Sequence, residues 1–246
     1  MSEDLFRQDA YLRECTATVT DVGEQGIVLD RTVFYPLGGG QAGDAGVLVL
    51  PDGSELAISD TRKGKDAEGR ATADICHLSA PDQASALTKV KPGDRVTARV
   101  DWNRRHNLMR FHTTTHLLCH LVPQLVNGCS ITPDYARLDF NMTDPLDKES
   151  LTAGIARLVA AAHPVAVGSI AEEELDANPA LVKSMSVQPP RGTGRIRTIR
   201  IGGDALIDFQ PCGGTHVANT AEIGAVVVTK IEKKSATTRR VVLGFA

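Results

Sequence analysis

The chain has 246 residues, of which 42% are hydrophobic and 23% charged, ordinary values for a protein with a buried core. Its formal net charge is −3 and only 4% of its residues are aromatic. These values argue against a uniformly basic nucleic-acid binder and against a protein that stacks many bases on aromatic rings. The five cysteines form no CxxC pair, and no apolar run reaches about 18 residues, so we expect a cytoplasmic protein without disulfides, membrane span or secretory signal.

The first hundred residues are predicted to form short strands joined by turns. Turn signals such as Pro51-Asp52-Gly53 and Lys91-Pro92-Gly93-Asp94 separate the apolar segments, and residues 63–70 are expected to be a polar loop. The expected strands cover residues 15–21, 26–30, 46–50 and 95–100. Many closely spaced short strands favour a small antiparallel β-barrel domain, which we assign to residues 1–99.

A glycine-rich stretch interrupts this domain at residues 34–46, FYPLGGGQAGDAG. Glycines tolerate positive φ and allow another chain segment to approach closely. The stretch matches neither GxxxxGK[ST] nor GxGxxG, so nucleotide phosphate binding is unsupported. Taken alone, it is as consistent with a tightly turned or mobile loop as with a functional segment.

The second part of the chain, residues 100–246, is predicted to be an α+β domain with helices packed on an antiparallel sheet. A helix is expected over residues 104–126, with Pro123 and Asn127-Gly128 as its end signals. Asp144-Pro145 predicts the start of a second helix reaching about residue 162, and a short helix is expected over 179–185. The expected strands cover residues 137–140, 166–173, 195–201, 205–209, 223–230 and 238–243.

Two histidines stand four residues apart within the first of these helices. His112 and His116 would project from the same helix face, where they can hold one metal ion. His120 continues the spacing, so a pair formed by His116 and His120 is the alternative. Zinc peptidases carry HExxH, with glutamate as the general base, and Thr113 occupies that position here, which argues against peptidase chemistry.

A second partial site, Cys212-Gly-Gly-Thr-His216, lies far downstream. Alone it is equally well explained as a tight turn with a buried cysteine. Together with His112 and His116, its thiol and imidazole complete a four-ligand set of the kind that binds zinc.

Three segments in this order, GGGQAGDAG, HTTTHLL and CGGTHV, resemble the alanyl-tRNA editing family. That family contains the editing domain of alanyl-tRNA synthetase and the free-standing AlaX proteins. The resemblance covers nearly the whole chain and matches the longer free-standing form. Asn127-Gly128-Cys129-Ser130 departs from the Gln and Gly-Ser usual in the synthetase domains, which makes the amino-acid preference less secure than the reaction.

The resemblance implies a zinc-dependent aminoacyl-tRNA deacylase that removes serine, or glycine, from mischarged alanine tRNA. Its implied partner is tRNA, with no DNA or membrane partner, and we expect a monomer or homodimer with one Zn²⁺ per chain. The implied zinc ligands are His112, His116, Cys212 and His216. The implied contacts to substrate and tRNA are Gly38, Gly39, Gly40 and Gln41, to which we add the cations Arg104 and Arg105 before the histidines.

We predict Thr113, Thr114 and Asp208 as catalytic residues. The hydroxyls lie next to the ligands, and the carboxylate can orient a ligand imidazole, although a surface acid at a strand end is an equal alternative for Asp208. Two arginine- and lysine-rich clusters are candidates for RNA contact, and either of them can also be a solvated face. Their members are Arg191, Arg195, Arg197 and Arg200 in the first and Lys230, Lys233, Lys234, Arg239 and Arg240 in the second.

Three alternatives stay open. The same deacylation can act on another tRNA, for example serine on threonine tRNA. The protein can be a non-catalytic RNA-binding module with a structural zinc, which four protein ligands would favour. A zinc esterase or amidase for a small molecule would leave the glycine-rich domain unexplained.

Overall fold

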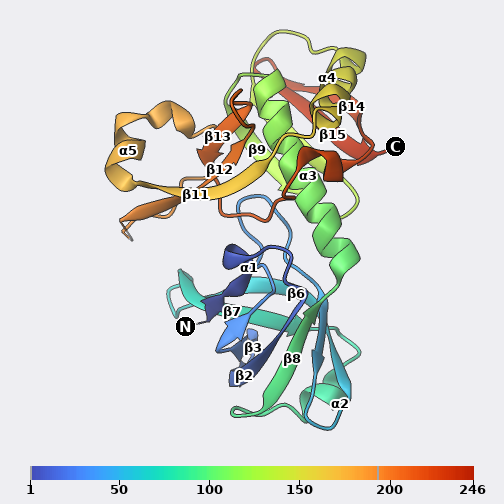
Figure 1. Ribbon diagram of the computed structural model, residues 1–246. Coiled ribbons are helices and arrows are strands. Elements are labelled where there is room, and N and C mark those ends of the chain that lie inside the picture. The colour runs from blue at the N-terminus through green and yellow to red at the C-terminus, as the bar shows by residue number, and fades with distance from the viewer. Residues whose placement is uncertain (1, 193) are drawn as a thin grey trace. The chain divides into compact units, whose positions relative to one another are not determined.

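The computed structural model describes residues 2–192 and 194–246, which divide into two compact units (Figure 1). The first unit comprises residues up to 38 together with 42–106, and the second comprises 39–41 together with 107–246. We expected a boundary between residues 99 and 100. In the structure the division falls between His106 and Asn107, so the first turn of the long helix α3 (Trp102–Leu121) belongs to the first unit.

Six antiparallel strands of the first unit close into a barrel in the order β2-β3-β7-β6-β5-β8. In β8, Val96, Ala98 and Val100 are buried and alternate with more exposed residues, as in a strand with one face in a core. The elements of this unit are β1 (Glu3–Asp4), α1 (Leu5–Gln8), β2 (Glu14–Gly23), β3 (Gly26–Leu29), β4 (Arg31–Thr32), β5 (Gly46–Val49), β6 (Glu55–Lys65), β7 (Ala71–Ser79), α2 (Ala84–Leu87) and β8 (Arg95–Val100).

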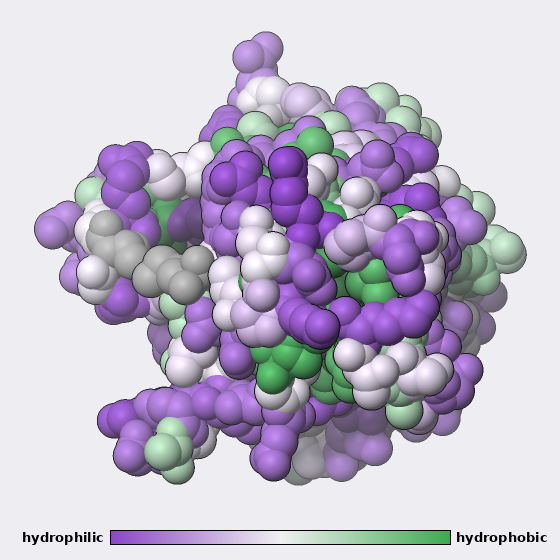
Figure 2. Space-filling model, turned by 90° about the horizontal axis from the view of Figure 1, so that it is seen from below, coloured by the Kyte–Doolittle hydropathy of each residue, from purple (hydrophilic) through white to green (hydrophobic). Residues whose placement is uncertain are grey.

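The strands expected at 15–21, 26–30, 46–50 and 95–100 are present as β2, β3, β5 and β8. The polar loop expected at 63–70 is shorter, because β6 continues to Lys65 and pairs there with Ala71 of β7. Figure 2 shows a largely hydrophilic face of the molecule on which apolar residues form separate areas. That distribution is expected when each strand buries one face and exposes the other.

The second unit contains two antiparallel sheets, ordered β14-β15-β10-β9 and β11-β12-β13. α3 is buried almost all round from Leu108 to Cys119, and Phe111 stacks near Phe245 of β15 with ring centroids 4.2 Å apart. The remaining elements are β9 (Val126–Ile131), β10 (Ala136–Asn141), α4 (Lys148–Ala160), β11 (Val165–Ala171), α5 (Glu172–Ala177), the 3-10 turn η1 (Pro179–Leu181), β12 (Arg195–Ile201), β13 (Asp208–Pro211), the 3-10 turn η2 (Thr220–Ile223), β14 (Val226–Ser235) and β15 (Thr238–Phe245).

Several predicted boundaries in this unit are wrong. The first helix ends at Leu121, before Pro123, and Val126 begins a strand that pairs with β10, so Asn127-Gly128 is not a helix stop. The strand expected at 166–173 ends at Ala171, where the Glu174 side chain accepts from the Ala171 amide and α5 begins.

Smaller differences concern the ends of three further elements. The expected helix 179–185 is only the turn η1, and the strand expected at 205–209 is β13 at Asp208–Pro211. The second helix starts at Lys148, because Asp147, and not Asp144, accepts the capping hydrogen bond from the Ser150 amide. The predicted α+β class with antiparallel sheets is confirmed. In the part of the chain that the structure describes, no helix is long and apolar enough to cross a membrane.

Candidate metal centre

Two histidines of α3 lie one helical turn apart inside the second unit. His112 and His116 are 5% and 4% exposed, and their ring centroids are 5.5 Å apart. Residues four apart in a helix project from the same face, so α3 itself holds the pair. Because the surrounding helix positions are buried as well, the two imidazoles face the protein interior.

The thiol and the third imidazole come from the turn that follows β13. Cys212 Sγ lies 3.5 Å from His112 Nε2 and 3.3 Å from His216 Nε2. The His216 ring centroid is 4.3 Å from that of His112 and 4.6 Å from that of His116. Gly214 permits this approach, because a Cβ at this position would lie 2.1 Å from His112 Cε1.

The two helix imidazoles are each held through Nδ1. His112 Nδ1 is 2.7 Å from Gln41 Oε1, and His116 Nδ1 is 2.8 Å from Asp208 Oδ2. Amide and carboxylate oxygens accept hydrogen bonds, so both histidines carry a proton on Nδ1. Nε2 of each ring is therefore the atom that remains for the interior of the cluster.

Thr113 holds the third imidazole from the helix side. Its Oγ1 donates to Met109 O at 2.9 Å, accepts from the Val217 amide at 3.2 Å and lies 3.1 Å from His216 Nδ1. Since the hydroxyl proton goes to Met109, the contact with His216 is a hydrogen bond donated by Nδ1. Nε2 of His216 is thus directed toward Cys212, as the distance of 3.3 Å shows.

Burial and neighbouring charges shift three pKa values in the cluster. Burial raises the pKa of the Cys212 thiol, but His112 and His216 outweigh it and hold that pKa well below its usual value. Burial lowers the pKa of His116, but Asp208 and Cys212 outweigh it and raise that pKa to about 10. Burial holds the pKa of His216 well below its ordinary value. The thiolate is the form of cysteine that binds a divalent cation, and binding of such a cation would release the additional proton that the raised pKa leaves on His116.

The four side chains fit a zinc ion in number, type and spacing. One ligand atom from each of His112, His116, Cys212 and His216 lies within 4.8 Å of all the others. Tetrahedral Zn–N bonds of 2.0–2.1 Å and a Zn–S bond of 2.3 Å put ligand atoms about 3.3–3.6 Å apart. The two Cys212 distances of 3.3 and 3.5 Å agree with that spacing.

Comparison with known proteins identifies the family. A model described as "Threonyl and Alanyl tRNA synthetase second additional domain" matches residues 196–242, and one described as "tRNA synthetases class II (A)" matches residues 8–104. The alanyl-tRNA editing protein AlaX-M of Methanosarcina acetivorans is 34% identical to the chain, covering 98% of the chain and 97% of that relative. The chain belongs to the AlaX-M family.

Other relatives agree with this assignment. AlaX-M of Saccharolobus solfataricus is 31% identical over 98% of both chains. An alanine–tRNA ligase of Metallosphaera sedula is 33% identical over 94% of the chain, but the match covers only 25% of the ligase. The chain therefore corresponds in length to the AlaX-M proteins and to a quarter of the ligase.

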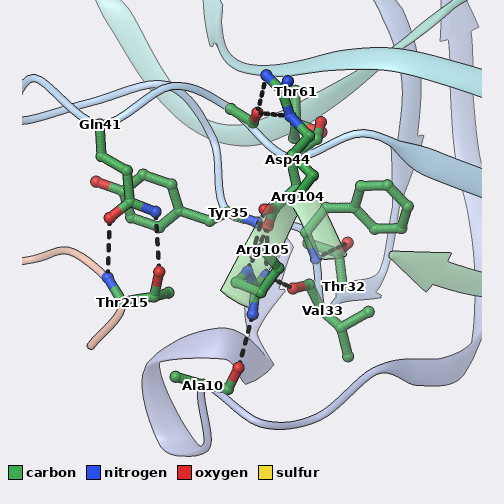
Figure 3. A network of polar contacts seen from close by, with 12 residues as sticks. Ala10, Thr32, Val33, Tyr35, Gln41, Asp44, Thr61, Arg104, Arg105 and Thr215 are labelled. Atoms are coloured by element: carbon green, nitrogen blue, oxygen red, sulfur yellow. Dashed lines mark hydrogen bonds and ion pairs between the residues drawn. The ribbon is translucent and has the colours of Figure 1, made fainter. Parts of the chain in front are cut away.

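In this AlaX-M family protein, Gln41 connects the glycine-rich stretch to the cluster. Gln41 Nε2 donates to Thr215 Oγ1 at 2.9 Å, and Gln41 Oε1 accepts from the Thr215 amide at 3.1 Å (Figure 3). The same oxygen lies 2.7 Å from His112 Nδ1. The side chain is fully buried. It therefore fixes one imidazole and the downstream turn together, and its predicted contact with tRNA stays a prediction.

The neighbouring glycines are explained by backbone conformation and close approach. Gly39 and Gly40 have φ of +60° and +87°, values that side chains rarely tolerate. A Cβ on Gly40 would lie 3.0 Å from Cys129, and the Gly40 carbonyl accepts from the Ile131 amide at 2.7 Å. Gly40 thus lets the segment lie against β9. The roles predicted for Gly38, Gly39 and Gly40 in binding tRNA stay predictions.

Arg105 is buried in the first unit, contrary to the prediction that it contacts tRNA. Its guanidinium donates to both Asp44 carboxylate oxygens, to Val33 O and to Ala10 O at 2.9 Å, as Figure 3 shows. The side chain is 0% exposed. A buried guanidinium with these partners has no face left for a phosphate, so we assign Arg105 to the architecture of this unit. Arg104 is only partly buried and donates to Gly43 O at 3.1 and 3.0 Å, and its tRNA contact stays a prediction.

The predicted catalytic roles of Thr113 and Thr114 also stay predictions. Both hydroxyls donate to backbone carbonyls one turn earlier, and Thr114 Oγ1 lies 2.8 Å from Arg110 O. Asp208 is 5% exposed and contacts His116, which fits an orienting carboxylate better than a surface acid.

Sequence reasoning missed Gln210. Its Nε2 donates to Asp208 Oδ2 at 2.8 Å and lies 3.2 Å from His116 Nδ1. The available signal was the alternation of Asp208, Gln210 and Cys212, because alternate residues of a strand share one face.

Proposed function

We propose that this protein is a zinc-dependent deacylase that removes serine, and also glycine, from mischarged alanine tRNA. The observation that carries the proposal is the cluster of Cys212 with the buried His112, His116 and His216 in a chain that matches AlaX-M proteins over nearly its full length. The second unit would be the editing domain, and the first would be the barrel domain that supplies the glycine-rich stretch.

In the proposed mechanism, the four clustered side chains hold the ion. Zinc bound by this set would act as a Lewis acid that polarises a carbonyl or a water molecule. Gln41, Asp208 and Thr113 keep the three imidazoles oriented through Nδ1, so that no reorganisation is needed when substrate arrives. An aminoacyl ester is already activated, so orientation of this kind supplies much of what hydrolysis requires.

Discrimination follows from hydrogen bonding to the serine hydroxyl. A site built for alanine cannot strongly reject an isostere that only adds a hydroxyl. A second site with polar groups for that hydroxyl favours serine, because those groups remain unpaired when alanine enters. We therefore propose that alanine on its own tRNA is spared.

Two specific observations favour other functions. The family model over residues 196–242 describes threonyl as well as alanyl synthetases, which supports serine on threonine tRNA as an alternative substrate. Four protein ligands can saturate a tetrahedral ion, which supports a non-catalytic RNA-binding module with structural zinc.

Single-turnover deacylation tests the proposal. We expect rapid loss of serine from Ser-tRNA(Ala), slow loss of alanine from Ala-tRNA(Ala) and slow loss of serine from Ser-tRNA(Thr). Cys212→Ala removes one ligand of the cluster and should lower the rate on Ser-tRNA(Ala) at least about a hundredfold, since each 1.4 kcal/mol of lost stabilisation is tenfold.

Cys15→Ala is the control, because Cys15 is likewise a free, partly exposed cysteine but lies in the first unit. It should leave both the rate and the zinc content unchanged. Equal rates on the two seryl-tRNAs would transfer the assignment to a less tRNA-specific deacylase. A zinc-loaded protein that hydrolyses none of the three esters would refute the enzymatic proposal.

A further inference from the structure

The face of the β11-β12-β13 sheet that carries the cluster continues beyond it. Residue 201 of β12 pairs with Asp208 of β13, and residue 199 pairs with Gln210, so these positions share a face. The next position along that face pairs Arg197 with Cys212: the Cys212 amide donates to Arg197 O at 3.2 Å. Arg197 Nη1 in turn donates to Cys212 O at 2.6 Å. The guanidinium of Arg197 therefore lies directly beside the backbone of a cluster residue.

This face becomes progressively more exposed with distance from the cluster. Along β12, Ile199 is fully buried, Arg197 is partly buried and Arg195 is exposed. On the neighbouring edge strand β11, Val167 pairs with Ile199 and Ser169 pairs with Arg197. Val167 is 57% exposed and Ser169 is exposed. An open strip thus begins at the candidate metal centre and runs outward along the two strands.

This strip combines cationic, polar and apolar side chains that lie next to one another on the two strands. Arg195 Nε donates to Ser169 Oγ at 2.8 Å, and its Nη2 donates to Ser169 O at 2.9 Å. Arg195 and Arg197 are two residues apart on one strand, which separates their Cα atoms by about 6.5 Å on the same face. Val167 adds exposed apolar surface beside the two guanidinium groups.

The other cationic residues considered from sequence are placed differently. Arg200 lies on the opposite face of β12, because it is an odd number of residues away from both Arg195 and Arg197 and successive strand residues alternate between faces. Its Nη2 donates to Gly203 O. Arg239 is 8% exposed and donates to Thr143 O, and Arg240 makes two hydrogen bonds to the Asp139 carboxylate. Among the arginines of β12, Arg195 and Arg197 are thus the two that share a face with the candidate centre.

We propose that this strip, defined as Val167, Ser169, Arg195 and Arg197, binds the single-stranded 3′ end of the tRNA. The inference rests on the proposed function and names the surface that would deliver the substrate. The ester is attached to the terminal ribose, so the charges of the substrate nearest to it are the phosphates of the last nucleotides. Arg197 and Arg195 contact those phosphates in sequence, and Val167 lies against a base, because every base offers an apolar face.

The test measures RNA binding separately from hydrolysis. The probes are a 5′-labelled RNA minihelix with a single-stranded ACCA 3′ end and the same minihelix without that end, measured by fluorescence anisotropy with the full chain. Arg195→Glu should weaken binding of the tailed minihelix about tenfold. It should also reduce the slope of log affinity against log salt concentration by the amount expected for about one lost phosphate contact. Binding of the blunt minihelix should not change.

Arg197→Lys is the second variant, because it keeps the positive charge next to Cys212 while losing the guanidinium fork. It should weaken binding of the tailed minihelix by about threefold to tenfold and leave zinc content unchanged. Arg200→Ala is the matched control, since it removes an exposed arginine from the opposite face of the same strand. Equal affinity of wild type and both variants for the tailed RNA would overturn the inference, as would an equal loss in Arg200→Ala.

Deacylation of Ser-tRNA(Ala) by the same variants separates the two proposals. If the wild type hydrolyses the ester and both variants raise KM without lowering kcat, the strip binds substrate as inferred. If the wild type hydrolyses the ester and the variants keep its KM and affinity, only the strip is refuted. If the wild type hydrolyses nothing but Arg195→Glu still selectively weakens tailed RNA, the strip stands and the deacylase proposal falls.

Discussion

At the scale of single residues, the orientation of an imidazole decides what the cluster can bind. Asp208 Oδ2 lies 2.8 Å from His116 Nδ1 and also accepts from Gln210. Asp208→Asn removes the negative charge while keeping an acceptor of similar size. We expect zinc affinity to fall about tenfold to a hundredfold, the usual effect of changing a partner of a metal-ligating histidine. Competition with a chromophoric chelator measures this affinity.

A carboxylate that is bonded to arginines rather than to a ligand histidine provides the control for this prediction. Asp139 is partly buried and is bonded to Arg137 and Arg240. Asp139→Asn should leave zinc affinity unchanged, although the lost ion pairs should reduce stability. Equal zinc affinities in the Asp208 variant and the wild type would mean that the carboxylate does not orient His116.

At the scale of elements, the cluster depends on the close approach of the 212–216 turn to α3. A Cβ on Gly214 would lie 2.1 Å from His112 Cε1 and 2.8 Å from Gln41 Oε1. Gly214→Ala must therefore displace the imidazole or the turn, at a cost of about 1–3 kcal/mol. If that cost falls on the metal-bound state, zinc affinity drops about fivefold to 150-fold. Zinc titration monitored by elemental analysis checks the expectation.

Gly203→Ala tests whether this effect is specific to the turn. Gly203 lies in the connection between β12 and β13, and a Cβ there would meet no atom within 4 Å. We expect it to bind zinc like the wild type. A Gly214→Ala protein with wild-type zinc affinity would show that the approach of the turn is less constrained than the contacts indicate.

At the scale of the whole molecule, the two units carry their own titratable groups, and His77 belongs to the first. Its ring is buried between Thr32 Oγ1, at 2.8 Å, and Ile27 O, at 2.9 Å, and burial lowers its pKa to about 4. In the unfolded chain His77 takes up a proton as the pH falls below about 6.5, whereas in the folded protein it stays neutral down to about pH 4. Its contribution to the free energy of unfolding is therefore constant above about pH 6.5. Between pH 6.5 and pH 4 the free energy of unfolding should fall by about 3 kcal/mol.

Urea unfolding followed by the fluorescence of Trp102, the single tryptophan and a residue of the first unit, measures this loss. His77→Gln keeps a donor and an acceptor but removes the titration, so its stability should depend less on pH over that range. His120→Gln changes an exposed histidine and should retain the wild-type dependence. Identical pH dependence in His77→Gln and the wild type would contradict the assignment.

The helix that carries His112 and His116 and the residue set of the candidate centre could be predicted from the chain, because helical spacing and ligand chemistry are properties of short segments. The sequence also indicated most barrel strands through period-two alternation. The sequence did not reveal β9, the segment after Pro123, because Asn127-Gly128 has the composition of a helix stop although it lies within a strand that pairs with β10.

By contrast, the folded arrangement of distant segments determines which polar residues face the cluster and which ones stabilise the fold. Gln41 reaches His112 from a glycine-rich segment 71 residues upstream, and the register of β13 places Gln210 beside His116. Arg105 is a cationic residue of the type that contacts RNA, but its side chain is buried in an ion pair with Asp44. Burial and partner choice depend on the packing of distant segments, and no local pattern encodes that packing.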